Sequence, residues 1–283
     1  MLIRTRSQAV LLCTRAIPAG CLLIAACTSD PTSSSLSAPA ADATPITEHD
    51  PMTPAPTSVV IPAPGQSVRV AGDRSTTVTG SDGDFRSGKC RIDTPLPAGY
   101  PKPTPPGAIE LKTYPSVRLA AVSGTGNPDR GMNRAFWPLF NHIKSHDIAM
   151  TSPVEMNYQT LPSADDNSAG EWSMAFLYRE PDMNKVGVEG SVTVRDAAPV
   201  TVVAVGLSGN YSMKLVNSGM REIEDWLAAN PQWKPAGSWR TLYYNGPTLF
   251  FWNKWAEVQI PVVPASEADR RDEPETSSPQ VSS

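Results

Sequence analysis

The chain has 283 residues, of which 40% are hydrophobic and 18% are charged, and its formal net charge at pH 7 is −4. An acidic chain without a cluster of lysine or arginine cannot supply the phosphate neutralisation on which nucleic-acid binding depends. We therefore expect no nucleic-acid partner. The length allows one sizeable apolar core together with flexible segments.

The first residues are typical of a secretory signal. Arg4, Arg6 and Arg15 precede an apolar run from residue 16 to residue 26 that carries no charge. A basic lead, a short apolar segment and small residues at its end are the features of such a signal. The run is too short to cross a hydrocarbon core of about 30 Å as a helix. Residues 1–26 are therefore predicted to be a signal peptide.

The apolar run ends in Leu-Ile-Ala-Ala ahead of Cys27, which resembles the lipobox of bacterial lipoproteins. The resemblance implies cleavage before Cys27 and a diacylglyceryl thioether on its sulfur. Two acyl chains anchor a protein stably, whereas one does not. We therefore predict a protein of the bacterial cell envelope that is lipid-anchored to a membrane, with its folded domain outside the cytoplasm. The alternative is an ordinary signal cut near Ala26.

The remaining cysteines restrict covalent cross-linking. Cys13 and Cys21 lie in the predicted signal, and Cys27 is predicted to carry lipid, so only Cys90 remains as a thiol. No disulfide can then form within one chain, and apolar burial must stabilise the core. We expect Cys90 to be a free thiol in a poorly ordered segment, and pairing with another chain is the alternative.

Composition divides the mature chain into three parts. Residues 27–106 begin with the predicted lipidated cysteine and are rich in proline and serine, so we expect a mostly disordered tether, with room for a small hairpin between residues 66 and 100. The folded domain is predicted over residues 107–264. Residues 265–283, rich in serine and charged side chains, are expected to form a disordered tail.

Inside residues 107–264 the pattern of strand and helix signals is repeated. Leu-Lys-Thr-Tyr-Pro at 111–115 leads into apolar residues that alternate over 117–121, and Val-Arg-Asp-Ala-Ala-Pro at 194–199 leads into a similar alternation over 200–204. Alternation of this kind predicts strands. It recurs over residues 172–178 and 258–262, where we expect the strands that close each half.

A helix is predicted after the first strand of each half. In the second half, Val216, Met220, Ile223 and Leu227 share one helical face, and the pair at 230–231, Asn-Pro, ends the helix.

In the first half, Asn127 is the expected cap and Pro128 the first helical residue, while Pro138 is expected to kink the helix. The apolar face of this helix comprises Met132, Phe136, Leu139, Phe140 and Ile143. Two βαββ units predict an α+β domain, in which two helices pack on a strongly curved antiparallel sheet or distorted barrel.

Several motifs of this domain resemble the SOUL haem-binding family. The most specific is Ile-Ala-Met-Thr-Ser-Pro-Val at residues 148–154, and the segments 109–115, 136–143, 206–209 and 257–261 are similar to other family motifs. The likeness covers essentially all of the predicted domain. It implies the twofold βαββ barrel that the family shares with gyrase-inhibitor-like domains. It also implies that haem or a related tetrapyrrole binds in an apolar groove beside the first helix.

Two segments depart from the family pattern. Family members often carry basic residues in the first helix, whereas here Arg134 is the only charged residue of 134–141. Near the closing strand the family usually has Pro-Pro and paired arginines, whereas this chain has Pro247 alone, followed by Phe-Phe-Trp-Asn-Lys at 250–254.

Two histidines of the predicted domain, His142 and His146, are spaced to share one face near the end of the first helix. Either could be an axial ligand of haem iron, or the two could form part of a metal site. The alternative is two solvated imidazoles that the helix C-terminus favours. A zinc protease is excluded because the segment His-Ile-Lys-Ser-His has no glutamate to act as a base. We also expect no structural zinc site, since no cysteine lies near the segment.

We therefore predict a ligand-binding lipoprotein rather than an enzyme, with haem, a related tetrapyrrole or another planar amphiphile as its ligand. Aromatic rings give flat walls suited to a macrocycle, and five of the seven tryptophans lie between residues 226 and 255. We expect Arg134 or Lys144 to pair with a ligand carboxylate. The predicted groove is lined by Met132, Phe136 and Phe140 and closed by Trp252 and Trp255.

Two alternatives belong to other classes of protein. One is an envelope hydrolase or isomerase that acts on a small amphipathic substrate through Glu257, although a strand glutamate that faces water is the simpler interpretation of this residue. The other is a structural or partner-binding lipoprotein whose groove holds a peptide or a lipid. The sequence identifies no protein partner.

Overall fold

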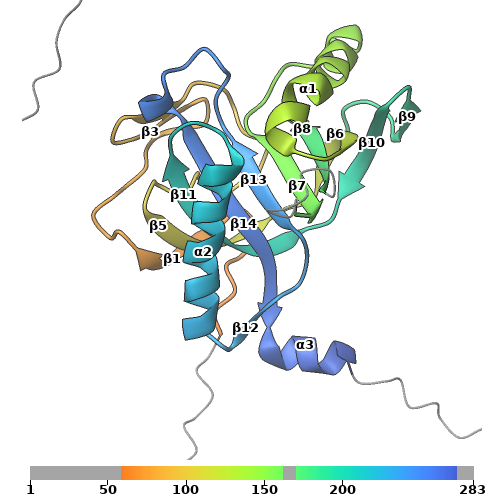
Figure 1. The fold of residues 1–283 in the computed structure, drawn as a ribbon. Helices are drawn as coiled ribbons and strands as arrows, with labels where there is room; N and C mark the ends of the chain where they lie inside the picture. Colours follow the sequence, from red (N-terminus) through yellow and green to blue (C-terminus); the bar gives the residue numbers. More distant parts are fainter. Residues whose placement is uncertain (1–58, 162–169, 273–283) are drawn as a thin grey trace, which may run out of the picture. The chain divides into compact units, whose positions relative to one another are not determined.

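The computed structural model describes residues 59–161 and 170–272 (Figure 1). The predicted signal at 1–26, Cys27, the first part of the tether and residues 273–283 lie outside the described residues. Within the described part of the chain, no helix has both the length and the apolar character that crossing a membrane requires.

The helices and strands alternate along the chain as an α+β protein. Their bounds are β1 Ser67–Gly72, β2 Thr79–Ser81, β3 Asp84–Ser87, β4 Cys90–Ile92, β5 Ala108–Tyr114, β6 Val117–Thr125, α1 Pro128–Ser145, β7 Val154–Thr160, β8 Glu171–Leu177, β9 Gly187–Glu189, β10 Val192–Ala197, β11 Val200–Ser208, α2 Met213–Ala229, β12 Trp233–Pro235, β13 Trp239–Tyr243, the 3-10 turn η1 Phe251–Asn253, β14 Trp255–Pro264 and α3 Ala265–Asp272.

One large curved sheet organises these elements. Its strand order is β1-β5-β11-β14-β13-β7-β8-β6-β10-β9, with β12 paired to β14, while β2, β3 and β4 form a small second sheet. The strand pairs of both sheets are antiparallel. The predicted α+β class with a curved antiparallel sheet is thus confirmed. Strands and helices occur in both predicted halves, but the equivalence of the halves stays a prediction.

The helices form where the sequence signals placed them. The Asn127 side chain accepts a hydrogen bond from the Asp129 amide, and α1 begins at Pro128 and runs through Pro138 as one helix. In α2 the Ser212 hydroxyl caps the first turn by accepting from the Leu215 amide. The apolar faces of both helices pack against the same large core, which includes Leu139, Ile143, Val216, Met220 and Ile223.

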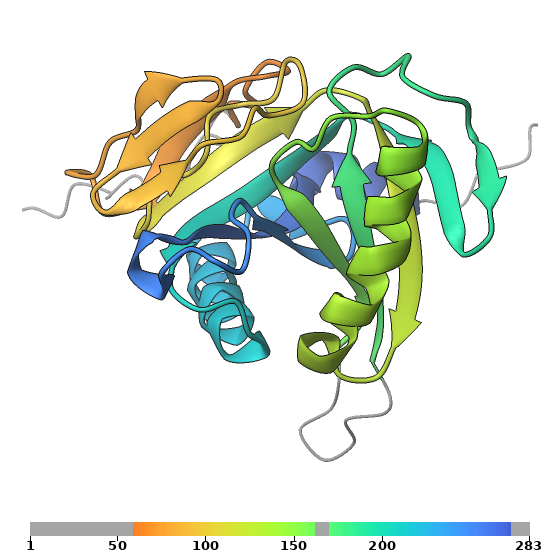
Figure 2. The same ribbon diagram turned by 90° about the horizontal axis from the view of Figure 1, so that it is seen from above.

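The two faces of the large sheet bury different residues. Because neighbouring residues of a strand point to opposite faces, Val258 and Ile260 of β14 join the core beneath the helices, while Trp255 and Glu257 point the other way. Figure 2 shows α2 on one side of β5 and β11 and the segment before β5 on the other. The second face is therefore covered by residues that precede the predicted domain.

Residues 59–106 are called the covering segment. Its structure shows that the expectation of a mostly disordered stretch at 27–106 is wrong for this part of the chain. Residues 59–106 are ordered: β1 pairs with β5, and Phe85, Ile92 and Leu96 are buried against Trp255 and other residues of the large sheet. The apolar residues of this segment are too sparse to form a core of their own. They become buried because the second face of the sheet offers them an apolar surface.

A second correction concerns the end of the chain. Residues 265–272, expected to belong to a disordered tail, form α3, which contacts β12 and β14. The backbone amide of Ala265 donates to the carbonyl of Gln232 at 2.8 Å, which ties the start of α3 to the loop before β12.

The covering segment can be tested with two identical substitutions. Ile92 is fully buried and Ile61 is 48% exposed, although both precede the predicted domain. Ile92→Ala should lower the free energy of unfolding by about 2–5 kcal/mol, because a buried cavity is created. Ile61→Ala should cost less than about 1 kcal/mol. Urea unfolding followed by tryptophan fluorescence measures both, and equal effects would contradict the packing described.

Candidate ligand-binding site

The structure separates the aromatic residues that the sequence was expected to bring together. Met132 and Phe136 are half-buried and pack on the core beneath α1, which contacts β6, β8 and β10. Trp252 lies in η1, which contacts β4 and β11. The large sheet places these strands apart, so the predicted single groove is replaced by two aromatic surfaces.

The first surface lies on α1. The rings of Phe136 and Phe140 are stacked, with centroids 5.8 Å apart and planes at 15°, and the ring of Trp137 meets both edge-on. Trp137 is 60% exposed and Phe140 is 36% exposed. Trp137 is a residue that sequence reasoning missed, because it lies outside the apolar face of the helix.

The charged residues of α1 are divided between two sides of the helix. At about 100° per residue, Arg134 points away from Phe136 and Phe140, whereas Lys144 follows Phe140 by about one turn on the same side. Both side chains are exposed. Lys144 therefore lies beside Phe140 on the aromatic surface of α1. Arg134 precedes Trp137 by three residues, so it lies beside Trp137 on the same surface.

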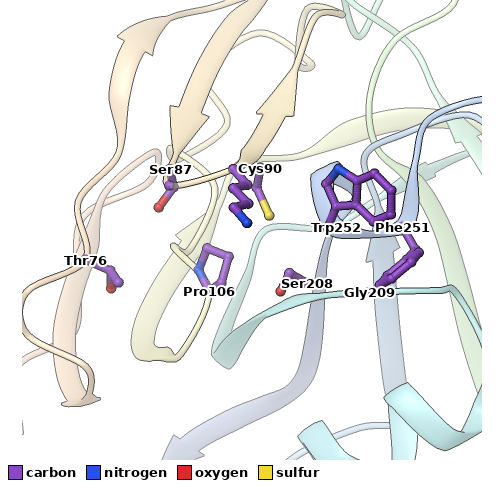
Figure 3. Close-up of a pocket in the computed structure, with 10 residues that line it drawn as sticks. Thr76, Ser87, Cys90, Pro106, Ser208, Gly209, Phe251 and Trp252 are labelled. Carbon is purple, nitrogen blue, oxygen red and sulfur yellow. The ribbon is translucent and has the colours of Figure 1, made fainter.

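The second surface is concave and is called the aromatic hollow below. It has a volume of about 400 Å³ and lies between the covering segment, the end of β11 and η1 (Figure 3). Phe251 and Trp252 face it, and Phe250 stacks on Trp252 with centroids 4.9 Å apart and planes at 5°. Its lining comprises Thr76, Ser87, Gly88, Lys89, Cys90, Pro106, Ser208, Gly209, Phe251 and Trp252.

Cys90 is a buried residue of this hollow. Its Sγ lies 3.3 Å from the carbonyl oxygen of Lys254, and it is the free cysteine of the described residues. Burial raises the pKa of the thiol to about 11. Cys90 therefore remains a protonated thiol at neutral pH, and the expectation of a poorly ordered segment around it is wrong, because it belongs to β4.

Trp255 does not close a groove. Its side chain is fully buried, and its indole Nε1 donates to the carbonyl oxygen of Thr104 at 2.7 Å. The residue packs beside Tyr244 and Leu242 in the core beneath the covering segment. Its role is to fix this segment on the sheet, so only Trp252 of the two predicted lid residues has a surface that a ligand can reach.

The two histidines lie away from the aromatic hollow, in the last turn of α1. His142 is buried, and its Nε2 lies 2.9 Å from the Tyr178 hydroxyl. His146 caps the helix and is partly exposed, with Nδ1 2.9 Å from the carbonyl oxygen of His142. Neither residue lines the hollow, so a tetrapyrrole bound there does not meet them.

Glu257 occupies the centre of the covered face and is fully buried, contrary to the view that it faces water. Its Oε1 accepts from the Thr104 amide at 2.8 Å, from Lys112 Nζ at 3.0 Å and from the Tyr244 hydroxyl at 2.6 Å. Its Oε2 accepts from Lys112 Nζ at 3.0 Å and from Gln259 Nε2 at 2.6 Å. The carboxylate is thus paired with a buried cation and surrounded by donors.

Neighbouring groups extend this polar network across the sheet. Arg240 donates from Nε to Gln259 Oε1 at 2.8 Å and from Nη1 to Glu155 Oε2 at 3.3 Å, and its guanidinium lies over the Tyr114 ring. Burial and the Glu257 carboxylate raise the pKa of Tyr244 well above its ordinary value, so its hydroxyl stays a donor. Glu257 is thus fully buried, and both of its carboxylate oxygens accept hydrogen bonds inside this network.

Some residues of the hollow could be predicted from the sequence. Ser208 and Gly209 belong to a segment that is similar to a family motif, and Trp252 was expected to close the groove. Lys89 and Cys90 were missed as lining residues, because they lie in a segment whose composition predicts disorder and their approach to η1 depends on the covered face of the sheet.

Comparison with known proteins places the chain in a family. The model of the SOUL heme-binding protein family matches residues 100–261, which is more than half of the 283 residues. The chain therefore belongs to the SOUL heme-binding family. The match begins after β4, so most of the covering segment lies outside it. No curated protein matches the chain.

Among solved structures, the C-terminal domain of EcmrR is similar to this chain, with 15% identity, 55% of this chain and 97% of that chain covered, and a TM-score of 0.47. A hydrolase from Listeria innocua has 15% identity, coverage of 57% and 94%, and a TM-score of 0.44. SAV2435 bound to tetraphenylphosphonium has 13% identity, coverage of 58% and 98%, and a TM-score of 0.36. Likenesses this distant carry no argument about activity.

The buried ion pair can be tested by removing its cation. Lys112→Met keeps most of the side-chain length but leaves the Glu257 carboxylate without its closest cation. We expect the free energy of unfolding to fall by about 3–5 kcal/mol. The loss should be smaller in Lys112→Met/Glu257→Gln, since glutamine carries no charge to compensate. Urea unfolding measures both variants, and a single variant as stable as the parent would contradict the role assigned to the pair.

Proposed function

We propose that this protein binds haem, or a related tetrapyrrole or planar amphiphile, in the aromatic hollow. Membership of the SOUL heme-binding family supports this class of ligand. The observation that carries the choice of site is the group of exposed rings at the hollow: Phe250, Phe251 and Trp252 are 66%, 50% and 46% exposed. Apolar rings exposed beside a concavity are typical of a surface that a ligand covers.

The energetics of these rings suit a flat ligand. An aromatic side chain presents about 150–250 Å², so covering the exposed half of each ring removes roughly 100 Å² from water. At about 25 cal/mol per Å² this contributes about 2.5 kcal/mol per ring before the costs of association. Lys89 lines the same hollow and offers an ammonium group to a carboxylate such as a propionate.

The residues of the hollow fit the macrocycle rather than its iron. The Cys90 thiol donates to a backbone carbonyl and has a raised pKa, so it is not a ready thiolate ligand at neutral pH. Histidine does not line the hollow. We infer that rings and shape hold the ligand, so protoporphyrin IX without iron should bind about as well as haemin. Iron, when present, would supply only its spectrum.

The aromatic surface of α1 is the second candidate site, because Trp137 and Phe140 are exposed there beside Lys144. The resemblance to the family implies a groove beside this helix. A tetrapyrrole on α1 would lie nearer to His142 and His146 than one in the hollow, and would make ligation of iron by either histidine possible. A pair of tryptophan substitutions distinguishes the two sites.

Haemin titration of the chain from residue 28 onward, followed at the Soret band, tests the proposal. Saturation should occur near one equivalent. Trp252→Ala should weaken binding about tenfold or more, since it removes the ring beside the hollow, at a cost of about 1.4 kcal/mol per factor of ten. Trp137→Ala is the matched control, because it removes an exposed tryptophan from α1, and it should change affinity by less than about threefold.

The haemin titration distinguishes the two candidate sites and tests whether haem binds specifically. A loss of affinity in Trp137→Ala alone would move the site to α1. Absorbance that drifts without saturating would show that the chain does not bind haem specifically. Replacing haemin by protoporphyrin IX, with fluorescence as the signal, then tests the inference that iron is not needed. An affinity for protoporphyrin IX at least tenfold weaker than for haemin would contradict it.

We further propose that the protein is a lipoprotein of the bacterial cell envelope, held on a membrane through Cys27. The sequence at residues 23–27 supports this proposal, and a tether would separate the lipid from the domain. Cys27→Ser should abolish incorporation of labelled palmitate by the expressed chain, since serine has no thiol to form the thioether. Cys21→Ser, in the same leader, should retain the label. Label retained in Cys27→Ser would contradict the assignment.

A further inference from the structure

Three side chains with metal-ligating atoms meet at the C-terminal end of α1. His142 and His146 come from the last turn of the helix, and Glu189 comes from β9. One ligand atom of each lies within 4.8 Å of the others. His142 Nδ1 lies 3.0 Å from Glu189 Oε2, and His146 Nε2 lies 3.4 Å from the same oxygen.

The His142 ring carries a buried nitrogen without a hydrogen-bond partner. Its side chain is 3% exposed, and although Nδ1 is close to the Glu189 carboxylate, the two are not aligned as a hydrogen bond. Buried polar atoms are almost always paired, so an orphaned one requires an explanation. A metal ion explains it, because the ion takes the nitrogen lone pair and the carboxylate oxygen together.

The hydrogen bonds on the far sides of both rings suit metal ligands. The carbonyl oxygen of His142 can only accept, so His146 Nδ1 donates to it, and Nε2 is the nitrogen that faces Glu189. His142 Nε2 lies 2.9 Å from the Tyr178 hydroxyl and 3.4 Å from the Asn184 side-chain nitrogen. In the tautomer that donates from Nε2 to the hydroxyl, the lone pair is on Nδ1. A metal-binding histidine usually donates its other N–H to such an oxygen, which fixes the tautomer and the ring.

The two distances from the Glu189 oxygen agree with one small ion. Nitrogen and oxygen ligands lie about 2.0–2.1 Å from Zn²⁺, and at tetrahedral angles two of them are therefore about 3.3 Å apart. The distances of 3.0 and 3.4 Å from the Glu189 oxygen to the two imidazole nitrogens are close to this value. Two imidazoles and one carboxylate are a ligand set that suits zinc and neighbouring divalent transition metals better than calcium or magnesium.

We propose that His142, His146 and Glu189 bind one divalent transition-metal ion of the Zn²⁺ class, with a fourth position open to water. The site joins the end of α1 to the short strand pair β9–β10. It lies outside the aromatic hollow and uses none of its residues. The metal site is therefore independent of the proposed tetrapyrrole ligand, and either can fail without the other.

Binding of Zn²⁺ and Co²⁺ to the tag-free full chain in detergent tests this site. We expect one equivalent of Zn²⁺ to bind at micromolar affinity or tighter, in competition with a chromophoric chelator, and Co²⁺ to show visible absorption bands of a four-coordinate site. His146→Ala and Glu189→Gln should each weaken binding at least tenfold. Both residues are exposed, so these variants should keep the fold, which circular dichroism checks.

Matched controls separate the site from general metal binding. Glu224→Gln removes an exposed carboxylate from α2 and should leave the affinity unchanged, and Trp252→Ala, which alters the hollow, should do the same. Zn²⁺ should raise the melting temperature of the parent chain but not of Glu189→Gln, because an ion that binds only the folded state stabilises it. Failure to bind one equivalent, or equal binding by parent and both ligand variants, would reduce the cluster to an ion pair and overturn the proposal.

Discussion

A buried ion pair, Lys112–Glu257, sets the conditions for the rest of the structure. Both charges lie on the sheet face opposite the helices and have no exposed surface. Removing charges from water costs free energy, so charges in such a place are tolerated only when they are paired and hydrogen-bonded. The two side chains pair with each other, and the Thr104 amide donates to the carboxylate. The small sheet, which lies before the family match, covers this face, so it is an integral part of the fold.

The aromatic hollow is a consequence of this cover. One part of its wall, including Lys89 and Cys90, comes from the covering segment, and the other, including Ser208 and Trp252, comes from the family domain. A hollow built at such a junction takes its shape from both. In the proposed function, ligand preference would therefore depend in part on Lys89 and Cys90, which lie outside the family match.

Helix α1 serves several purposes because its sides differ. Leu139 and Ile143 hold it on the sheet, Trp137 and Phe140 leave aromatic surface in water, and the last turn presents His142 toward β9. The helix periodicity of 3.6 residues separates these functions. The sequence predicted one groove for the two histidines, the aromatic residues of α1 and Trp252. In the structure, the histidines face β9, and Trp252 lies in η1, away from α1.

The sequence by itself determined the elements and their class. Periodic apolar residues and caps such as Asn127 place the helices, alternation places the strands, and the motif at 148–154 identifies the family, because these signals are local. Tertiary structure alone decided that Trp255 and Glu257 are buried, that residues 66–106 are ordered, and that Glu189 lies beside the two histidines. Each of these depends on contacts between residues far apart in the chain, which no local pattern records.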